Sequence, residues 1–117
     1  MKDTDARPVA ATLYFLPVET RVPLKFGPET LTSVTCARVR LTVEGTDGRR
    51  AEGWGETPLS VQWVWPGPLS YEERHEALKS FAVKLASSWA GFAVYGHPIE
   101  VGHAFLEEEL KGRCGLV

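Results

Sequence analysis

Glu52 and Glu56 are the first residues of this chain whose type and spacing could do chemistry. Both lie in a segment that alternates as a β-strand, on either side of Trp54, so their carboxylates belong to the same strand face. Glycoside hydrolysis uses two carboxylates that flank one bond, one of them as general acid. Because the sequence around them builds no cleft, we interpret the two as charged strand residues in contact with water.

A second group consists of His97, Glu100 and His103, which follow one another at three-residue steps. Such steps place side chains near one another on a helix, where they could bind a metal ion. Metal sites on one helix usually use histidines four residues apart with added ligands, and only Glu107 follows here on the same side. We therefore interpret this group as a helix cap and surface residues, and we assign no metal ligand.

Two segments carry side chains suited to binding rather than to catalysis. Trp63 and Trp65 lie in the loop predicted from Pro58 to Pro68, and Lys25 follows the first strand. Exposed tryptophans could bind a sugar or a partner protein, whereas a buried one would pack on the sheet or on a helix. Lys25 could contact an anionic substrate or be an ordinary surface lysine. No nucleophile elbow or phosphate-binding glycine loop is present, so we assign no catalytic residue.

Three strand-like segments precede the helices and would position these side chains. They are predicted at Val9–Val18, Ser33–Glu44 and Arg50–Thr57. The second alternates apolar and charged residues, which is typical of an antiparallel sheet with one face in water. Pro17 cannot donate to a sheet ladder, so we expect an edge or a bulge there. The turn residues Gly45 to Gly48 predict a tight reversal between the second and third strands.

The first long helix has clear start and stop signals. Ser70 followed by Glu73 forms a capping box, and Gly91 provides a stop. Between them, apolar residues recur at three- and four-residue steps, which predicts a stripe that packs on the apolar face of the sheet. This stripe consists of Leu78, Phe81, Ala82, Leu85 and Trp89.

A second helix is predicted to begin at Pro98, after His97, and to end at Gly112. Proline is favoured in the first turn of a helix, and acidic residues there interact well with the helix dipole. We expect the inner seam of this helix to be Ile99, Leu106 and Leu110, with Val101 and Phe105 beside it.

Strands followed by helices predict an α+β fold, with a three-stranded antiparallel meander and two or three packed helices. The 117 residues are expected to form one domain, with a flexible tail over 1–8 and the start of a linker over 112–117. The net charge of −2 comes without any cluster of basic residues, which argues against nucleic-acid binding. The N-terminus lacks the apolar core of a signal peptide, and no apolar run is long enough for a membrane span. We therefore predict a cytoplasmic protein.

The order of these features resembles the N-terminal capping domain of the enolase superfamily, most closely in the mandelate racemase and muconate lactonizing group. The resemblance covers about residues 9–111. It depends on Val22–Gly27 after the first strand, on Val39–Val43 with the following Asp47-Gly48, and on Gly53-Trp54-Gly55-Glu56-Thr57-Pro58. None of these segments is distinctive alone, and their order and spacing carry the resemblance.

This resemblance implies that two loops, 20–30 and 58–68, fold over the open end of a barrel domain and set substrate choice. Lys25, Phe26, Trp63 and Trp65 would then be substrate-binding lid residues. The implied parent enzyme is a Mg²⁺-dependent racemase, epimerase, cycloisomerase or dehydratase that acts on a small carboxylate. Its catalytic bases and magnesium ligands would lie in the barrel, so the chain alone would hold no cofactor and perform no catalysis.

The implied partners are the barrel domain, the small carboxylate substrate and further copies of the chain, because an uncovered apolar surface favours self-association. An alternative function is a stand-alone binding module that uses the Trp63 and Trp65 loop for a carbohydrate or a protein. Whether the chain belongs to an enzyme stays open between these two interpretations.

Overall fold

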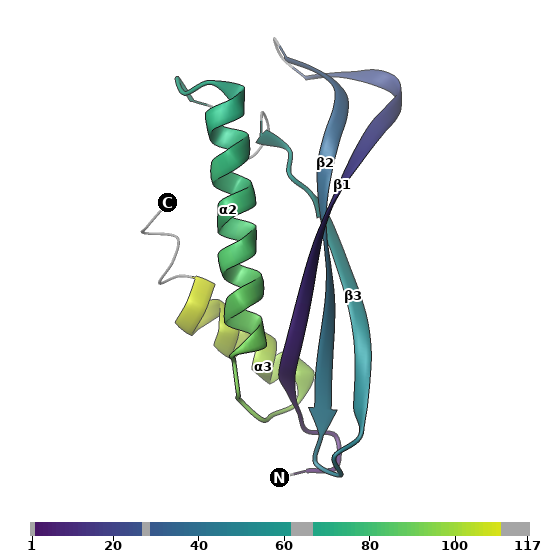
Figure 1. Cartoon of the computed structure of the whole chain (residues 1–117), viewed down its shortest axis with the longest axis vertical. Helices are drawn as coiled ribbons and strands as arrows, with labels where there is room; N and C mark the ends of the chain where they lie inside the picture. The colour runs from purple at the N-terminus through teal and green to yellow at the C-terminus, as the bar shows by residue number, and fades with distance from the viewer. Residues whose placement is uncertain (1, 27–28, 62–66, 111–117) are drawn as a thin grey trace.

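The computed structural model describes residues 2–26, 29–61 and 67–110, and it has the α+β architecture that the sequence predicts. A three-stranded antiparallel sheet with the order β1-β2-β3 is followed by helices (Figure 1). The strands are β1 (Ala6–Phe26), β2 (Glu29–Gly45) and β3 (Arg50–Pro58). The helical elements are α2 (Tyr71–Ala90), α3 (Pro98–Phe105) and the π-helical turn η1 (Leu106–Leu110).

The alternation in β2 sets the two faces of the sheet. Ala37 and Val39 line a groove beneath α2, and Ala37 is buried. Arg38 and Arg40 project from the opposite face, where Arg38 bonds to Glu56 of β3. The helix contacts mainly β1 and β2 (Figure 1). The sheet is therefore covered by helix on one side, as its apolar parity predicts.

The first hairpin is much longer than the sequence indicates. β1 runs from Ala6 to Phe26, so the tail predicted over 1–8 and the loop predicted over 20–30 both contain strand. Pro17 stays within β1, opposite Thr35, because β1 is an edge strand whose outer side needs no donor. Shifts in register between Pro8 and Ala10 and between Glu19 and Leu24 absorb the irregularities.

The reversal between β2 and β3 is formed as predicted. The amide of Gly48 donates to the carbonyl of Gly45 over 3.1 Å. Gly48 has a φ of 83°, which lies in the left-handed region that side chains disfavour. This turn fixes the continuous pairing of β3 with β2, from Arg50 opposite Glu44 to Pro58 opposite Cys36.

The boundaries of α2 follow the predicted signals. The hydroxyl of Ser70 accepts a hydrogen bond from the amide of Glu73 over 3.2 Å. At the other end, the amide of Gly91 donates to the carbonyl of Ser87. The predicted apolar stripe faces the sheet, where Leu78, Phe81, Ala82, Leu85 and Trp89 line one groove.

The core between α2 and α3 uses a different seam from the predicted one. Val101 and Phe105 are each only 5% exposed and pack with Phe92, whereas Ile99 is 77% exposed. Leu106 is also exposed. The predicted inner seam was therefore wrong at Ile99 and Leu106, while Leu110 is half-buried. The aromatic rings at the end of α2 select the 101/105 face of α3, which was predicted to lie beside the seam. The predicted helix end at Gly112 lies outside the described residues, as does the predicted linker over 112–117.

None of the helices within the described ranges is long and apolar enough to cross a membrane.

Candidate functional site

The resemblance assigns two segments to a lid, and their described parts, 20–26 with 29–30 and 58–61, lie at one end of the molecule. The outer part of the β1-β2 hairpin, the end of β3 and the start of α2 all lie at the end opposite the N-terminus (Figure 1). The amide of Leu59 donates to the carbonyl of Thr35 over 2.8 Å, which ties the chain after β3 to β2. Leu59 and Val61 are buried, so this connection is anchored.

A cleft of about 450 Å³ lies between the hairpin and the start of α2. Glu19, Ser33, Thr35 and Tyr71 give it polar groups that can accept or donate hydrogen bonds. Pro17, Val18 and Val34 supply the apolar part of its lining. Its mixture of apolar walls and a few polar groups is suited to binding a small polar molecule.

The structure describes two of the four predicted lid residues, Lys25 and Phe26. Lys25 is exposed in the outer part of the hairpin, with its Cα opposite that of Thr30. Phe26 is the last residue of β1 and pairs with Glu29. Trp63 and Trp65 lie outside the described residues. Lys25 is thus placed on a projecting ribbon rather than in a loop, and its ammonium group is accessible to an anion.

Apolar side chains near Lys25 are also exposed. Val22 is 63% exposed and Leu24 is 49% exposed, although both belong to β1. Because β3 ends opposite Cys36, the ribbon beyond this point has only two strands. Two-stranded ribbons gain little from their own packing, so this end of the hairpin is suited to contact with another surface.

Glu52 and Glu56 do not form an acid–base pair. Glu56 lies 3.0 Å from Arg38 in an ion pair, while Glu52 lies opposite Thr42. Four residues along a strand separate their Cα atoms by about 13 Å, beyond the spacing of the two carboxylates in glycosidases. The interpretation as exposed strand charges agrees with this geometry.

His97, Glu100 and His103 do not form a metal site either. The Nδ1 atom of His97 accepts from the amide of Ile99 over 3.2 Å, which makes His97 a helix cap. His103 lies 3.8 Å from Glu107 on the following turn. No group of three or more potential ligands gathers among the described residues, so they do not fit a magnesium ion.

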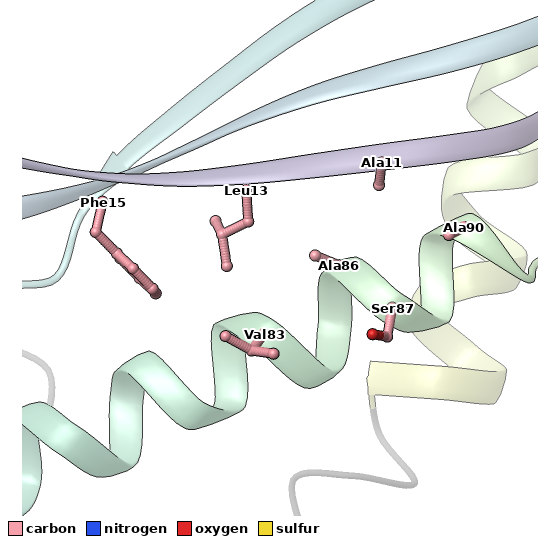
Figure 2. Close-up of a pocket in the computed structure, with 7 residues that line it drawn as sticks. All are labelled: Ala11, Leu13, Phe15, Val83, Ala86, Ser87 and Ala90. Atoms are coloured by element: carbon pink, nitrogen blue, oxygen red, sulfur yellow. The ribbon is translucent and has the colours of Figure 1, made fainter.

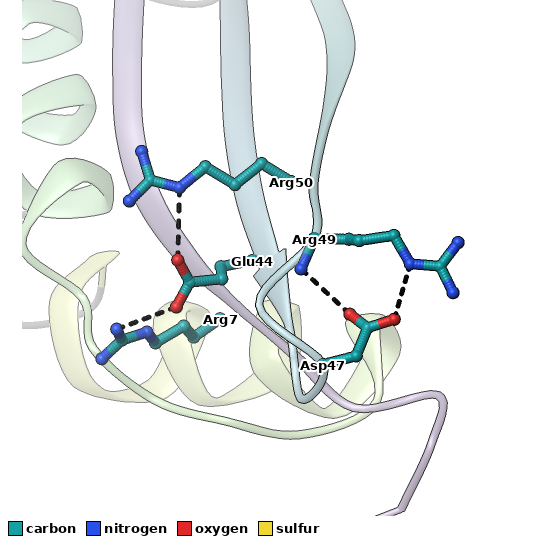
Figure 3. A network of polar contacts seen from close by, with 5 residues as sticks. All are labelled: Arg7, Glu44, Asp47, Arg49 and Arg50. Atoms are coloured by element: carbon teal, nitrogen blue, oxygen red, sulfur yellow. Dashed lines mark hydrogen bonds and ion pairs between the residues drawn. The ribbon is translucent and has the colours of Figure 1, made fainter.

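The outer face of the sheet holds an ion-pair network that the sequence does not reveal. Glu44 of β2 bonds to Arg7 of β1 over 3.1 Å and to Arg50 of β3 over 3.2 Å (Figure 3). The guanidinium of Arg50, and next that of Arg7, lowers the pKa of Glu44 below its ordinary value of 4.5. Knowledge of the strand register would have been needed to find this row of charges.

The same outer face carries exposed aromatic rings. Trp54 is 59% exposed and stacks on Tyr14, with 6.0 Å between the ring centroids. The guanidinium of Arg40 lies 6.0 Å from the centre of the Trp54 ring. In a cation–π contact of this kind, the guanidinium is weakly attracted to the face of the exposed ring.

The inner face of the sheet is only partly filled. A space of about 330 Å³ separates β1 from α2, with Leu13 and Phe15 facing Val83 (Figure 2). A groove of about 440 Å³ lies on the other side of α2, against β2 and β3. A Cβ atom at Gly53 or Gly55 would meet nothing within 4 Å. The small residues of β3 therefore leave apolar surface of β2 and α2 accessible.

Comparisons of the chain with family models, with curated proteins and with solved structures found no match.

Proposed function

We propose that this domain is the substrate-specificity lid of a mandelate racemase-type enzyme that acts on a small carboxylate. The observation that carries the proposal is the position of the two expected lid segments. The described parts of these segments, residues 20–26, 29–30 and 58–61, lie at one end of the molecule, next to a cleft with polar groups. Lids of this kind exclude water and contact the substrate, while a rigid scaffold holds them in place.

In this role, Lys25 attracts and orients the substrate carboxylate. Its ammonium group is exposed on the ribbon, from which it can reach an anion bound below the lid. A magnesium ion would stabilise the enediolate in such an enzyme, and the barrel domain would hold that ion. The described residues of this chain contribute binding and solvent exclusion, and they contribute no base.

The apolar groove between α2 and the sheet is evidence for a partner domain that covers it. Its floor is formed by Ala37, Val39 and the glycine-rich β3, and α2 forms one wall. Such a surface is stabilised when another domain removes it from water. In the proposed enzyme this partner is the barrel domain.

The test begins with the coding sequence that follows residue 117. The proposal expects several hundred further residues that alternate strands and helices, with a Lys-x-Lys motif and spaced acidic residues. The full protein should then catalyse a Mg²⁺-dependent exchange of the substrate proton next to the carboxylate for deuterium, and NMR would measure this exchange. A stop codon at this position would overturn the lid function and favour a binding module that uses Trp63 and Trp65.

A matched pair of variants tests the role of Lys25 in the full protein. Lys25→Ala should raise KM for the carboxylate about tenfold with a smaller effect on kcat, because the charge acts mainly in binding. Lys84→Ala is the control, since this exposed lysine lies on the middle of α2. Equal kinetic constants for both variants would show that Lys25 does not contribute to substrate binding.

A further inference from the structure

The outer edge of β3 is open within the described part of the chain. β3 pairs with β2 on one side and is the last strand of the sheet on the other (Figure 1). Every residue from Arg50 to Pro58 is exposed. Because the backbone groups on an open edge can pair with another strand, such an edge is a site for strand addition.

The other edge strand, β1, is protected against strand addition. It contains Pro8, Pro17 and Pro23, which cannot donate to a new strand, and its register shifts at two places. At its beginning, Ala6 already pairs with Gly96. β3 has no proline before its last residue, and its pairing with β2 is continuous. The contrast shows that only the β3 edge lacks these protective features.

The sequence of β3 is self-complementary in one antiparallel register. If a twofold axis perpendicular to the sheet passes at Gly53, Arg50 lies opposite Glu56 of the second copy, and this contact occurs twice. Glu52 then lies opposite Trp54. An axis at Trp54 would instead place Glu52 opposite Glu56 twice, which is unfavourable.

The register centred on Gly53 also extends the existing charge network. Within one chain, Arg7, Glu44 and Arg50 form a row of alternating charge across the three strands. Glu56 and Arg38 form the facing ion pair in the second copy. The joined row therefore alternates in sign over five side chains. It is made twice by the twofold axis.

From this edge and its charges, we propose that two copies of this chain pair through their β3 strands, centred on Gly53, to form one six-stranded antiparallel sheet. The helices of both copies lie on the same face of this sheet. Gly53 and Gly55 carry no side chains at this junction, and a Cβ atom built at either would meet nothing within 4 Å in the chain itself. This pairing is independent of the lid function.

Charge reversal tests the register. Arg50→Glu and Glu56→Arg should each raise the dissociation constant of the dimer at least about tenfold, because each variant places like charges opposite one another twice. An equimolar mixture of the two variants should form a heterodimer with the affinity of the original chain. In that mixture, residue 50 of one chain again faces an opposite charge at residue 56 of the other. Sedimentation over a concentration series measures the dissociation constants of the two variants and of their mixture.

The mixture separates this effect from a loss of fold. Arg50→Glu also breaks the contact with Glu44, and Glu56→Arg breaks that with Arg38, and mixing repairs neither. Arg49→Glu is the matched control, since Arg49 lies in the turn and contacts only the nearby Asp47 among the pairs that the structure describes. Its dimer should be unchanged. Failure of the mixture to recover dimer, or dimers of both single variants at the original affinity, would overturn the proposal.

Cysteine cross-linking gives a second measurement in a chain with Cys36 and Cys114 changed to serine. With Gly53→Cys, the two new thiols lie directly opposite one another, at a Cα distance of about 5 Å that suits a disulfide. With Gly55→Cys, the two Cα atoms are about 14 Å apart. The first variant should form a covalent dimer under mild oxidation and the second should not. A monomer at every concentration, or equal cross-linking of both variants, would overturn the proposal.

Discussion

The rings of Trp89 and Phe105 lie almost parallel, with 3.9 Å between their centroids and 10° between their planes. Phe92 meets Phe105 edge-on, with 5.4 Å between centroids. The contact joins the end of α2 to α3 and forms most of the described core in this part of the molecule. It therefore fixes how the helical layer closes over the sheet, at the end of the molecule away from the candidate site.

Removal of the Phe105 ring should be among the most damaging single changes in the core. Phe105 is 5% exposed, so Phe105→Ala leaves a cavity between two aromatic partners. We expect the free energy of unfolding to fall by about 3–5 kcal/mol, measured by urea denaturation. Leu106→Ala is the control, because Leu106 is 41% exposed and its loss should cost less than about 1 kcal/mol. Similar losses for both variants would contradict this account of the core.

The cap of α2 gives a second prediction. Ser70→Ala removes the acceptor for the amide of Glu73 and should lower the free energy of unfolding by about 1 kcal/mol. Ser80→Ala provides the comparison, since Ser80 is exposed within the same helix and alanine is the better helix former there. This control should be neutral or slightly stabilising. If thermal or urea denaturation shows no loss for Ser70→Ala, the side chain does not cap the helix.

Features with local causes could be predicted from the sequence. The start of α2 depends on a hydroxyl three residues from an amide, and the turn before β3 depends on Gly48. The two faces of β2 follow from side-chain alternation. Each of these needs only neighbouring residues, and the structure confirms each of them.

Features that depend on contacts across the fold could not be predicted. Both the 99/106/110 stripe of α3 and η1 and the 101/105 stripe of α3 are apolar, and only the position of Trp89 and Phe92 selects between them. The length of the first hairpin depends on the pairing of β1 with β2, which continues past Pro8 and Pro17. The local sequence alone would indicate that a strand ends at such prolines. At the candidate site, Lys25 has the expected exposure, while its place on a ribbon follows from that pairing.

Gly48 should tolerate a side chain poorly. Its φ of 83° disfavours all residues with a Cβ, although nothing lies within 4 Å of the Cβ position. Gly48→Ala should therefore lower the free energy of unfolding by about 1 kcal/mol through backbone strain alone. Gly102→Ala is the matched control. Gly102 lies inside α3 with open space around it, so alanine should stabilise the chain by up to about 1 kcal/mol. Opposite signs for these two variants in urea denaturation are the expected result.

The network around Glu44 predicts a pH dependence of stability. Hydrogen bonds from Arg50 and then from Arg7 lower the pKa of Glu44 from its ordinary value of 4.5. The ionised form of Glu44 is therefore more stable in the folded chain than in the unfolded chain. This contribution is fully present above pH 4.5 and is lost as the pH falls through the lowered pKa. Glu44→Gln should therefore be less stable than the original chain at neutral pH, and the difference should shrink below pH 4.5.

Asp47→Asn is the comparison for this prediction, measured by urea denaturation over the same pH series. The amide of Arg49, followed by its side chain, lowers the pKa of Asp47 from an ordinary value of 3.8. Its contribution therefore begins to be lost only below pH 3.8, so the stability difference for Asp47→Asn should begin to shrink at a lower pH than that for Glu44→Gln. Glu44 joins all three strands, whereas Asp47 only closes a turn. Added salt should therefore change the pH dependence of the stability difference to a different extent for the two variants. A difference for Glu44→Gln that does not change with pH would show that packing, and not the charge of Glu44, links the strands.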